Sequence, residues 1–306
     1  MHSDLQLPGF RIVTCLWRKA GRAAYHARSL SDDAEVCIET LDTAYPDRRQ
    51  VAMLSHEASI SRRLQGINGI RRIQAVLPHG SGNLALVCDL LDSSLATLLD
   101  HTPGRRLPVA QVLDIAHRLA QLLGDIHAQD IVHKSLAPHH VLIERQSGAL
   151  VLAGFGMASE LSQERQASQL AVESPDMLAY ISPEQTGRMN RSLDYRSDYY
   201  SLGCVLYELL TGQPPFTADN TLEWVHSHIS RTPPSPATLV PTLPDPLCAV
   251  ILKLLAKSPE DRYQSSVGLL HDLDLCTTAL DHHRPLLPFT LGEQDQLQKF
   301  LVPQAL

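Results

Sequence analysis

The sequence predicts an α+β fold, in which a small antiparallel sheet with one helix precedes a larger, mainly helical part. Up to Cys88, short apolar segments are separated by turn residues, a pattern that is typical of strands. After Cys88 the apolar residues recur at the longer intervals of helices. With 306 residues, 44% of them hydrophobic, the chain is long enough to bury a large core in two parts.

Three short strands open the predicted sheet. In the third of them, Val36 and Ile38 alternate with polar neighbours, as residues of a half-buried strand do. A hairpin completes the sheet, because two apolar segments flank the turn sequence Gly-Ser-Gly-Asn at residues 80–83. We expect the five strands at residues 10–15, 23–28, 35–40, 73–77 and 84–88.

One helix is expected between the third and fourth strands, at residues 47–64. Its apolar residues Val51, Leu54, Ala58 and Leu64 recur at near-helical intervals. A single helix of this kind would cover one face of the sheet.

Two long helices are expected in the second part of the chain. Residues 107–128 carry one apolar stripe, which indicates a helix that faces a core on one side. Residues 198–210 are apolar nearly all round, which indicates a helix that is buried on every side. Gly212 and Pro214 end that helix.

Charge and composition exclude several classes of function. A net charge of −7 is not that of a nucleic-acid-binding protein, and we expect the basic pair Arg71 and Arg72 on a solvated surface. The six cysteines form no C-x-x-C pair, so neither a disulfide framework nor a zinc ribbon is indicated, and a cytoplasmic location fits best. No apolar stretch approaches the ~20 residues of a membrane span, which predicts no membrane insertion.

Three motifs resemble the catalytic core of protein kinases. They are IVHKSLAPHHVLIE at residues 131–144, VLAGFGM at 151–157 and YISPEQ at 180–185. The resemblance covers residues 9–276 and implies the bilobal protein-kinase-like fold. We expect a sheet-containing N-lobe at 1–90, a helical C-lobe at 91–280, and a tail or linker at 281–306.

The resemblance also implies a set of structural residues. Glu57 takes the place of the ion-pairing glutamate on the small-lobe helix, and Arg262 is expected to pair with Glu184. The complete set is Glu57, His133, Phe155, Glu184, Asp198 and Arg262.

The residues that carry phosphoryl transfer in this family are replaced. The phosphate-pairing lysine of V-A-I-K corresponds to Glu39, and the catalytic aspartate of H-R-D corresponds to Ser135. The two magnesium-holding positions are His140 and Gly154, and Met177 replaces a threonine that contacts the catalytic aspartate. A carboxylate in place of a cation opposes phosphate binding, and a serine hydroxyl is a poor general base. We therefore expect no catalytic residues and no metal site.

The apolar lining of an adenine pocket is better preserved. It predicts either a residual nucleotide pocket or side chains that only pack the lobes together. The lining residues are Leu16, Ala24, Cys37, Cys88, Leu91, Leu142 and Ala153.

Two further interpretations concern charged and metal-binding side chains. Arg22 stands at the third glycine position of the Gly-rich loop, where it either supplies a cation for phosphate or neutralises Glu39 and Glu57. His133, His139 and His140 suggest a zinc site, but a structural or solvated role is favoured because no fourth ligand is in view.

The segment at residues 179–216 is similar to the kinase-like N-terminal domain of large bacterial signalling proteins that contain ATPase, sensor and histidine kinase modules. Together with the replacements, this predicts a catalytically inactive pseudokinase that regulates signal transduction. Its partner would be another protein or a following domain, and ATP binding would be weak and metal-independent. The alternative is a serine/threonine protein kinase with weak or atypical ATP-dependent phosphotransfer. Ser159, Ser162, Ser168 and Ser174 are candidate phosphorylation sites.

Overall fold

The computed structural model describes residues 5–91, 93–144, 147–161, 175–189, 191–282 and 284–296. The chain folds into two compact units. Unit 1 comprises Met1–Ser93 and Leu142–Met157, and unit 2 comprises Ser94–Val141 and Ala158–Leu306. The segment Leu142–Met157 therefore belongs to the same unit as the N-terminal strands, although it follows part of unit 2 in sequence. The predicted domain boundaries stay a prediction.

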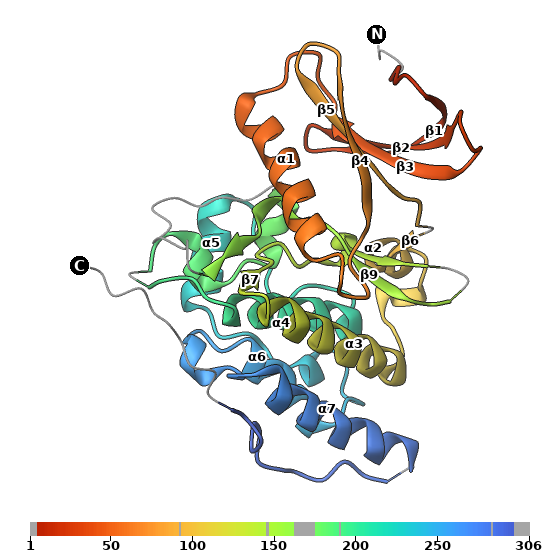
Figure 1. Ribbon diagram of the computed structural model, residues 1–306. Helices are drawn as coiled ribbons and strands as arrows, with labels where there is room; N and C mark the ends of the chain where they lie inside the picture. The colour runs from red at the N-terminus through yellow and green to blue at the C-terminus, as the bar shows by residue number, and fades with distance from the viewer. Residues whose placement is uncertain are drawn as a thin grey trace. The chain divides into compact units, whose positions relative to one another are not determined.

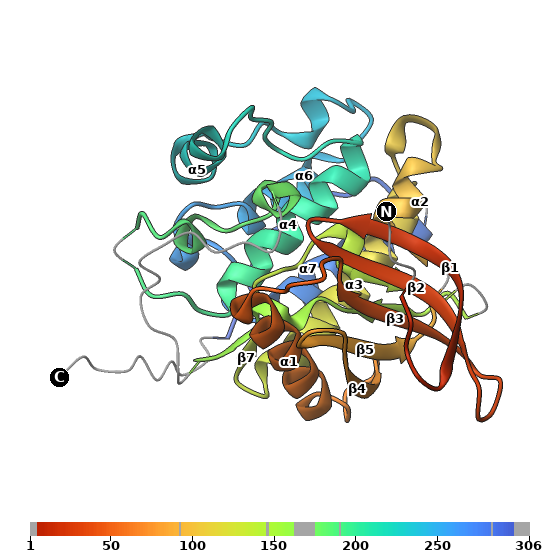
Figure 2. The ribbon, with the colours of Figure 1, turned by 90° about the horizontal axis from the view of Figure 1, so that it is seen from above.

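A five-stranded antiparallel sheet forms most of unit 1. The strands lie in the order β1-β2-β3-β5-β4, which can be followed across the sheet in Figure 2. The hairpin β4–β5 pairs with β3 through β5, so β3 and β5 are central strands. The bounds are β1 Phe10–Lys19, β2 Arg22–Ser29, β3 Glu35–Leu41, β4 Ile73–His79 and β5 Asn83–Asp89.

Helix α1 (Arg48–Arg63) covers one face of this sheet (Figure 1). The side chain of Asp47 caps its first turn by accepting a hydrogen bond from the backbone N–H of Arg49 at 3.2 Å. Leu54 and Ala58 of the helix are buried in one cluster with residues of β2, β3 and β5. The 3-10 turn Phe155–Met157 packs against α1, and the short strands β8 (Val141–Ile143) and β9 (Leu150–Leu152) precede it.

Unit 2 is mainly helical. Helix α3 packs against α4 and α7, and α6 contacts the same two helices (Figure 1). Helix α4 is buried on every side, since each of its residues after Arg196 is buried. The short strand β6 (Ser93–Ser94) leads into the unit, and β7 (Ile131–Val132) pairs with β10 (Ser159–Glu160). The helices are α2 Leu95–Asp100, α3 Val109–His127, α4 Arg196–Thr211, α5 Thr221–Ser230, α6 Asp245–Leu254 and α7 Ser266–Asp281.

The predicted elements are confirmed with small shifts in their ends. The expected helix at 107–128 is α3, and the expected buried helix at 198–210 is α4. Gly212 ends α4 in the left-handed conformation with φ of 84°, which a residue with a Cβ adopts only with strain.

Candidate functional site

Four charged side chains meet inside unit 1. Glu39 lies on β3, Glu57 on α1 and Arg22 on β2, and all three side chains are largely buried. Nη2 of Arg22 donates to Oε2 of Glu39 and to Oε2 of Glu57, each at 3.0 Å. Arg71 completes the group, because its Nη1 donates to Oε1 of Glu39. We call these four residues the ion network; its two cations and two carboxylates cancel.

The predicted surface location of Arg71 is wrong. The residue is 8% exposed. Burial alone would lower the pKa of its guanidinium, but the charges of Cys88 and Glu39 and the hydrogen bond to Glu39 raise that pKa well above the ordinary arginine value. Arg71 stands two residues before buried Ile73, so its side chain leaves the chain on the inward face. Its neighbour Arg72 is exposed as predicted.

The predicted pocket residues all belong to unit 1, but they are not equally placed. Ala24, Cys37 and Cys88 lie in the buried cluster that α1 covers. Leu16 is 45% exposed on β1 and is not among the residues of that cluster. Ala153 is buried after β9, whereas Leu91 and Leu142 are half-buried. The structure thus brings three of the seven residues together on one face of the sheet.

In unit 2, Asp198 of α4 holds the segment that carries the H-R-D-like motif. Its carboxylate accepts hydrogen bonds from the backbone N–H of His133 at 2.9 Å and from that of Lys134 at 2.8 Å. Nε2 of His127 lies 2.9 Å from the same carboxylate. Burial alone would raise the pKa of Asp198, but the hydrogen bond and charge of His127 and the charge of His133 hold it below its ordinary value.

The side chains of His133 and His140 both contact the backbone of Ser135. The backbone N–H of Ser135 donates to Nδ1 of His133 at 3.2 Å, and Nδ1 of His140 lies 2.6 Å from the carbonyl oxygen of Ser135. The rings of His139 and His140 meet edge to face, with centroids 4.3 Å apart. Within the described residues, no group of three or more His, Cys, Asp or Glu side chains is arranged to hold a metal ion.

The positions that bind magnesium in protein kinases do not fit that ion here. Mg²⁺ requires oxygen ligands, mainly carboxylates, in a near-octahedral arrangement. Gly154 has no side chain and adopts φ of 79°, and Nδ1 of His140 is engaged with the Ser135 carbonyl. Met177 is a buried apolar residue in the 3-10 turn Pro175–Ala179.

A buried ion pair fixes the base of unit 2. Nη1 and Nη2 of Arg262 donate to Oε1 and Oε2 of Glu184 at 2.7 and 2.9 Å, which is the pairing that the resemblance implies. Ser197 adds a hydrogen bond of 2.7 Å to the same carboxylate. Burial opposes ionisation of Glu184, but Arg262 and Ser197 keep its pKa below the ordinary value.

Phe155, in unit 1, is 1% exposed and lies in the turn that packs against α1.

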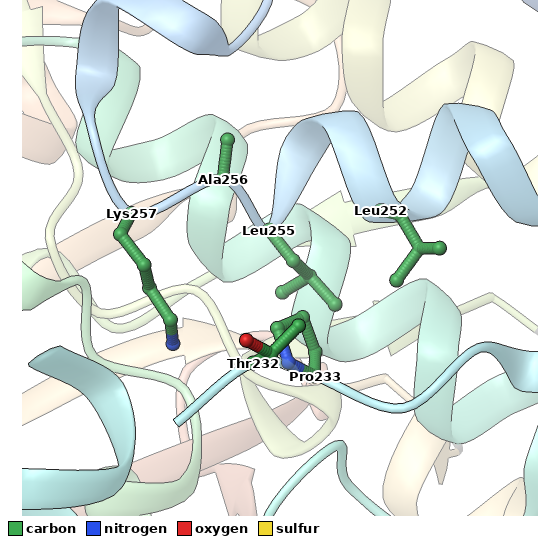
Figure 3. Close-up of a pocket in the computed structure, with 6 residues that line it drawn as sticks. All are labelled: Thr232, Pro233, Leu252, Leu255, Ala256 and Lys257. Atoms are coloured by element: carbon green, nitrogen blue, oxygen red, sulfur yellow. The ribbon is translucent and has the colours of Figure 1, made fainter. Parts of the chain in front are cut away.

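A pocket of about 280 Å³ lies elsewhere in unit 2 (Figure 3). None of the sequence-predicted site residues lines it. In Figure 3 the oxygen of Thr232 points toward the side on which the Lys257 amine ends. The amine donates to the Ser227 carbonyl at 3.1 Å and lies 4.4 Å from the Phe216 ring centroid. The lining residues are Thr232, Pro233, Leu252, Leu255, Ala256 and Lys257.

Two other expectations concern phosphorylation and membranes. Ser159 lies in β10, whereas Ser162, Ser168 and Ser174 lie outside the described residues. None of the helices that the structure describes has the length and apolar character that a membrane crossing requires.

The sequence matches the protein kinase domain family over residues 20–273. This chain belongs to the protein kinase family. The predicted α+β protein kinase fold, with a five-stranded antiparallel sheet in the N-lobe and a helical C-lobe, is thereby confirmed.

Bacterial serine/threonine protein kinases are among the relatives. The chain is 35% identical over 188 residues to PknB of Mycobacterium leprae. The matched segment covers 61% of this chain and 29% of PknB. It is 29% identical over 278 residues to a probable serine/threonine-protein kinase of Streptomyces coelicolor, covering 87% of this chain and 40% of the relative. Pkn1 of Myxococcus xanthus is 29% identical over 282 residues, and the match covers 87% of this chain and 38% of Pkn1. The chain therefore spans less than half the length of these relatives.

The prediction of a catalytically inactive pseudokinase is contradicted by these relatives, which are named as serine/threonine protein kinases. The prediction treated each replaced position as a lost function. The charge argument for inactivity does not hold at position 39, because the buried cations of Arg22 and Arg71 compensate the carboxylate of Glu39.

Proposed function

We propose that the chain is a serine/threonine protein kinase domain whose ATP-dependent phosphotransfer is weak or atypical. The observation that carries the proposal is the position of Asp198, which holds the backbone of His133 and Lys134 within a chain of the protein kinase family. A fixed loop matters because phosphoryl transfer depends mainly on positioning the reacting groups and stabilising their charge.

Arg22 is the side chain that we assign to phosphate charge. It lies on β2, next to the loop that covers the phosphates in protein kinases, and it is hydrogen-bonded to Glu39 and Glu57. Because two carboxylates already share its charge, a phosphate must compete with them. We therefore expect weak ATP binding. No step is assigned to a protein-bound metal ion, since His140 and Gly154 do not fit one.

We assign the proton-accepting role to the imidazole of His140. A carbonyl oxygen only accepts hydrogen bonds, so the contact of 2.6 Å with Ser135 requires a proton on Nδ1. The neutral ring then carries its lone pair on Nε2. In the proposed step a substrate hydroxyl attacks the γ-phosphorus, its proton passes to Nε2, and the bond from the γ-phosphorus to the bridging oxygen breaks.

We propose further that this kinase domain acts in signal transduction in the bacterial cytoplasm. Resemblance at residues 179–216 supports a kinase module that works with a protein partner or with other domains of a bacterial signalling protein. A cytoplasmic location is proposed because the six cysteines show no disulfide pattern.

The test is transfer of radiolabelled phosphate from ATP to serine- and threonine-containing peptides, with magnesium, with manganese and with a chelator. We expect transfer that His140→Ala lowers by ~10²-fold, the usual effect of removing a general base. His226→Ala is the control, because it removes an exposed imidazole of α5, and it should leave the rate unchanged. An unchanged rate in His140→Ala contradicts the assigned base, and no transfer under any condition contradicts the proposed function.

A further inference from the structure

Two of the six cysteines lie directly opposite each other in the sheet of unit 1. Cys37 on β3 and Cys88 on β5 are register partners in the antiparallel ladder. Directly opposed residues of such a ladder have Cα atoms about 4.5 or 5.5 Å apart, depending on the type of pair. Both separations fall within the range of about 4.4–6.8 Å that a disulfide spans. The Cα separation therefore suits a bond, whereas the Cβ atoms, about 4.5–5.5 Å apart in such pairs, must approach to about 3.5–4.5 Å for it to form.

Both cysteines also point to the same side of the sheet. Side chains alternate between faces along a strand, and partners directly across a ladder share a face. Cys37 and Cys88 are 3% and 2% exposed and lie in one buried cluster beneath α1, together with Leu54 and Ala58. Apart from this pair, the described cysteines have no cysteine as a register partner in the sheet.

We propose that Cys37 and Cys88 are an oxidative modification site, in which a peroxide converts the two thiols into a disulfide across β3 and β5. One sulfur attacks the O–O bond, forms a sulfenic acid and releases water. The second sulfur displaces the hydroxyl group, which leaves as a second water. Two S–H bonds are lost and one S–S bond forms, while the peroxide takes up two electrons and two protons.

The surroundings favour a slow reaction. Burial raises the pKa of Cys37 to about 11 and raises that of Cys88 well above its ordinary value. The positive charge of Arg71 opposes this effect at both thiols. Since the thiolate is the reactive form, oxidation proceeds on a longer timescale than at the exposed Cys15. Once one sulfur is oxidised, the second lies within reach.

The test is peptide mapping of the folded chain after graded exposure to hydrogen peroxide, with remaining thiols alkylated under denaturing conditions. We expect a cross-linked peptide pair containing Cys37 and Cys88, lighter by two hydrogen atoms and restored by dithiothreitol. A Cys15→Ser background should leave this cross-link unchanged, and Cys37→Ser should abolish it. Both thiols remaining fully alkylated when Cys15 is fully oxidised overturns the proposal, as does oxidation of either residue without a cross-link. The test needs no kinase activity, so it is independent of the proposed function.

Discussion

Nη2 of Arg22 lies 3.0 Å from Oε2 of Glu39, the residue at the position where protein kinases carry a lysine. The same nitrogen binds Glu57 of α1 at 3.0 Å, so one guanidinium joins the sheet to the helix. A lysine at position 39 would link strand and helix in the usual family arrangement. Here the cation comes from β2 and the carboxylate from β3, and the link between strand and helix is retained.

Restoring the family lysine should destabilise this chain. Glu39→Lys leaves the cations of Arg22 and Arg71 and the new ammonium group with only Glu57 to compensate them. Breaking a buried ion pair costs about 3–5 kcal/mol, and we expect a loss of that size in the free energy of unfolding. Denaturant titration measures it.

The control is Glu35→Lys, an exposed carboxylate on the same strand that binds Arg28. Its effect should stay below about 1 kcal/mol. Adding Arg71→Leu to Glu39→Lys should recover part of the stability, because it removes one of the uncompensated cations. Strictly additive effects of the two substitutions would show that the ion network does not act as a unit.

Asp198→Asn should disturb the segment at residues 131–140. An amide has one acceptor oxygen, whereas the Asp198 carboxylate receives hydrogen bonds from His127, His133 and Lys134. We expect a loss of about 3 kcal/mol in stability, measured by denaturant titration, together with a lower rate of phosphate transfer. Asp114→Asn, an exposed residue on α3, should change neither quantity. Wild-type transfer by Asp198→Asn would contradict the positioning role.

His228 should make the protein sensitive to acid. Burial lowers its pKa from 6.5 to about 3, and its ring accepts from the Tyr200 hydroxyl at 3.0 Å and donates to the Leu178 carbonyl at 2.8 Å. Between pH 6.5 and about pH 3 the imidazole of His228 binds a proton in the unfolded chain but not in the folded chain, so the free energy of unfolding falls as the pH falls. The contribution is on the order of 4 kcal/mol at pH 3.

The comparison of His228→Gln with wild type isolates this contribution from other titrating groups. His228→Gln should be less stable than wild type at neutral pH. The difference between their free energies of unfolding should narrow as the pH falls from 6.5 toward 3. His226→Gln, an exposed residue of the same helix, should follow the wild-type profile. A difference that stays constant with pH would contradict the assignment.

Arg262→Lys should be costly although it keeps the charge. The guanidinium donates to both oxygens of Glu184 and to the backbone carbonyls of Arg196, Ala256 and Lys257. An ammonium group has three donors and cannot reproduce these five contacts. We expect a loss of about 3 kcal/mol in a denaturant titration. Arg231→Lys at the surface is the control, and equal effects of the two substitutions would refute the specific role of Arg262.

Much of the fold is predictable because its local signals agree with its tertiary packing. The strand at 35–40 has β-branched residues and forms β3 with one residue added. The alternation predicts a half-buried strand, whereas both faces of β3 are buried, because Cys37 and Ile38 lie in two different core clusters. The buried helix α4 is predictable because it is apolar on every face. Helix α2 has only six residues and was not predicted, since so short a segment shows little of a helical period.

A comparison of motifs position by position predicts only part of the charge balance of the site. It gives the contact of Arg22 with Glu39 and Glu57 as one alternative, but it does not give the contact of Arg71 with Glu39. Arg71 lies 32 residues from Glu39 in sequence, in the segment before β4, where its backbone N–H donates to the Leu152 carbonyl. The one local signal for the inward direction of Arg71 is its position two residues before the buried Ile73. The opposition of Cys37 and Cys88 depends on strand register, which a single sequence does not fix.

The most direct measurement is the amount of phosphate that the purified wild-type chain transfers from radiolabelled ATP, followed by identification of the labelled amino acid. We expect slow incorporation on serine or threonine that persists in the presence of a chelator. Label that never exceeds that of the heat-denatured chain, at any ATP concentration and with any divalent ion, would contradict it.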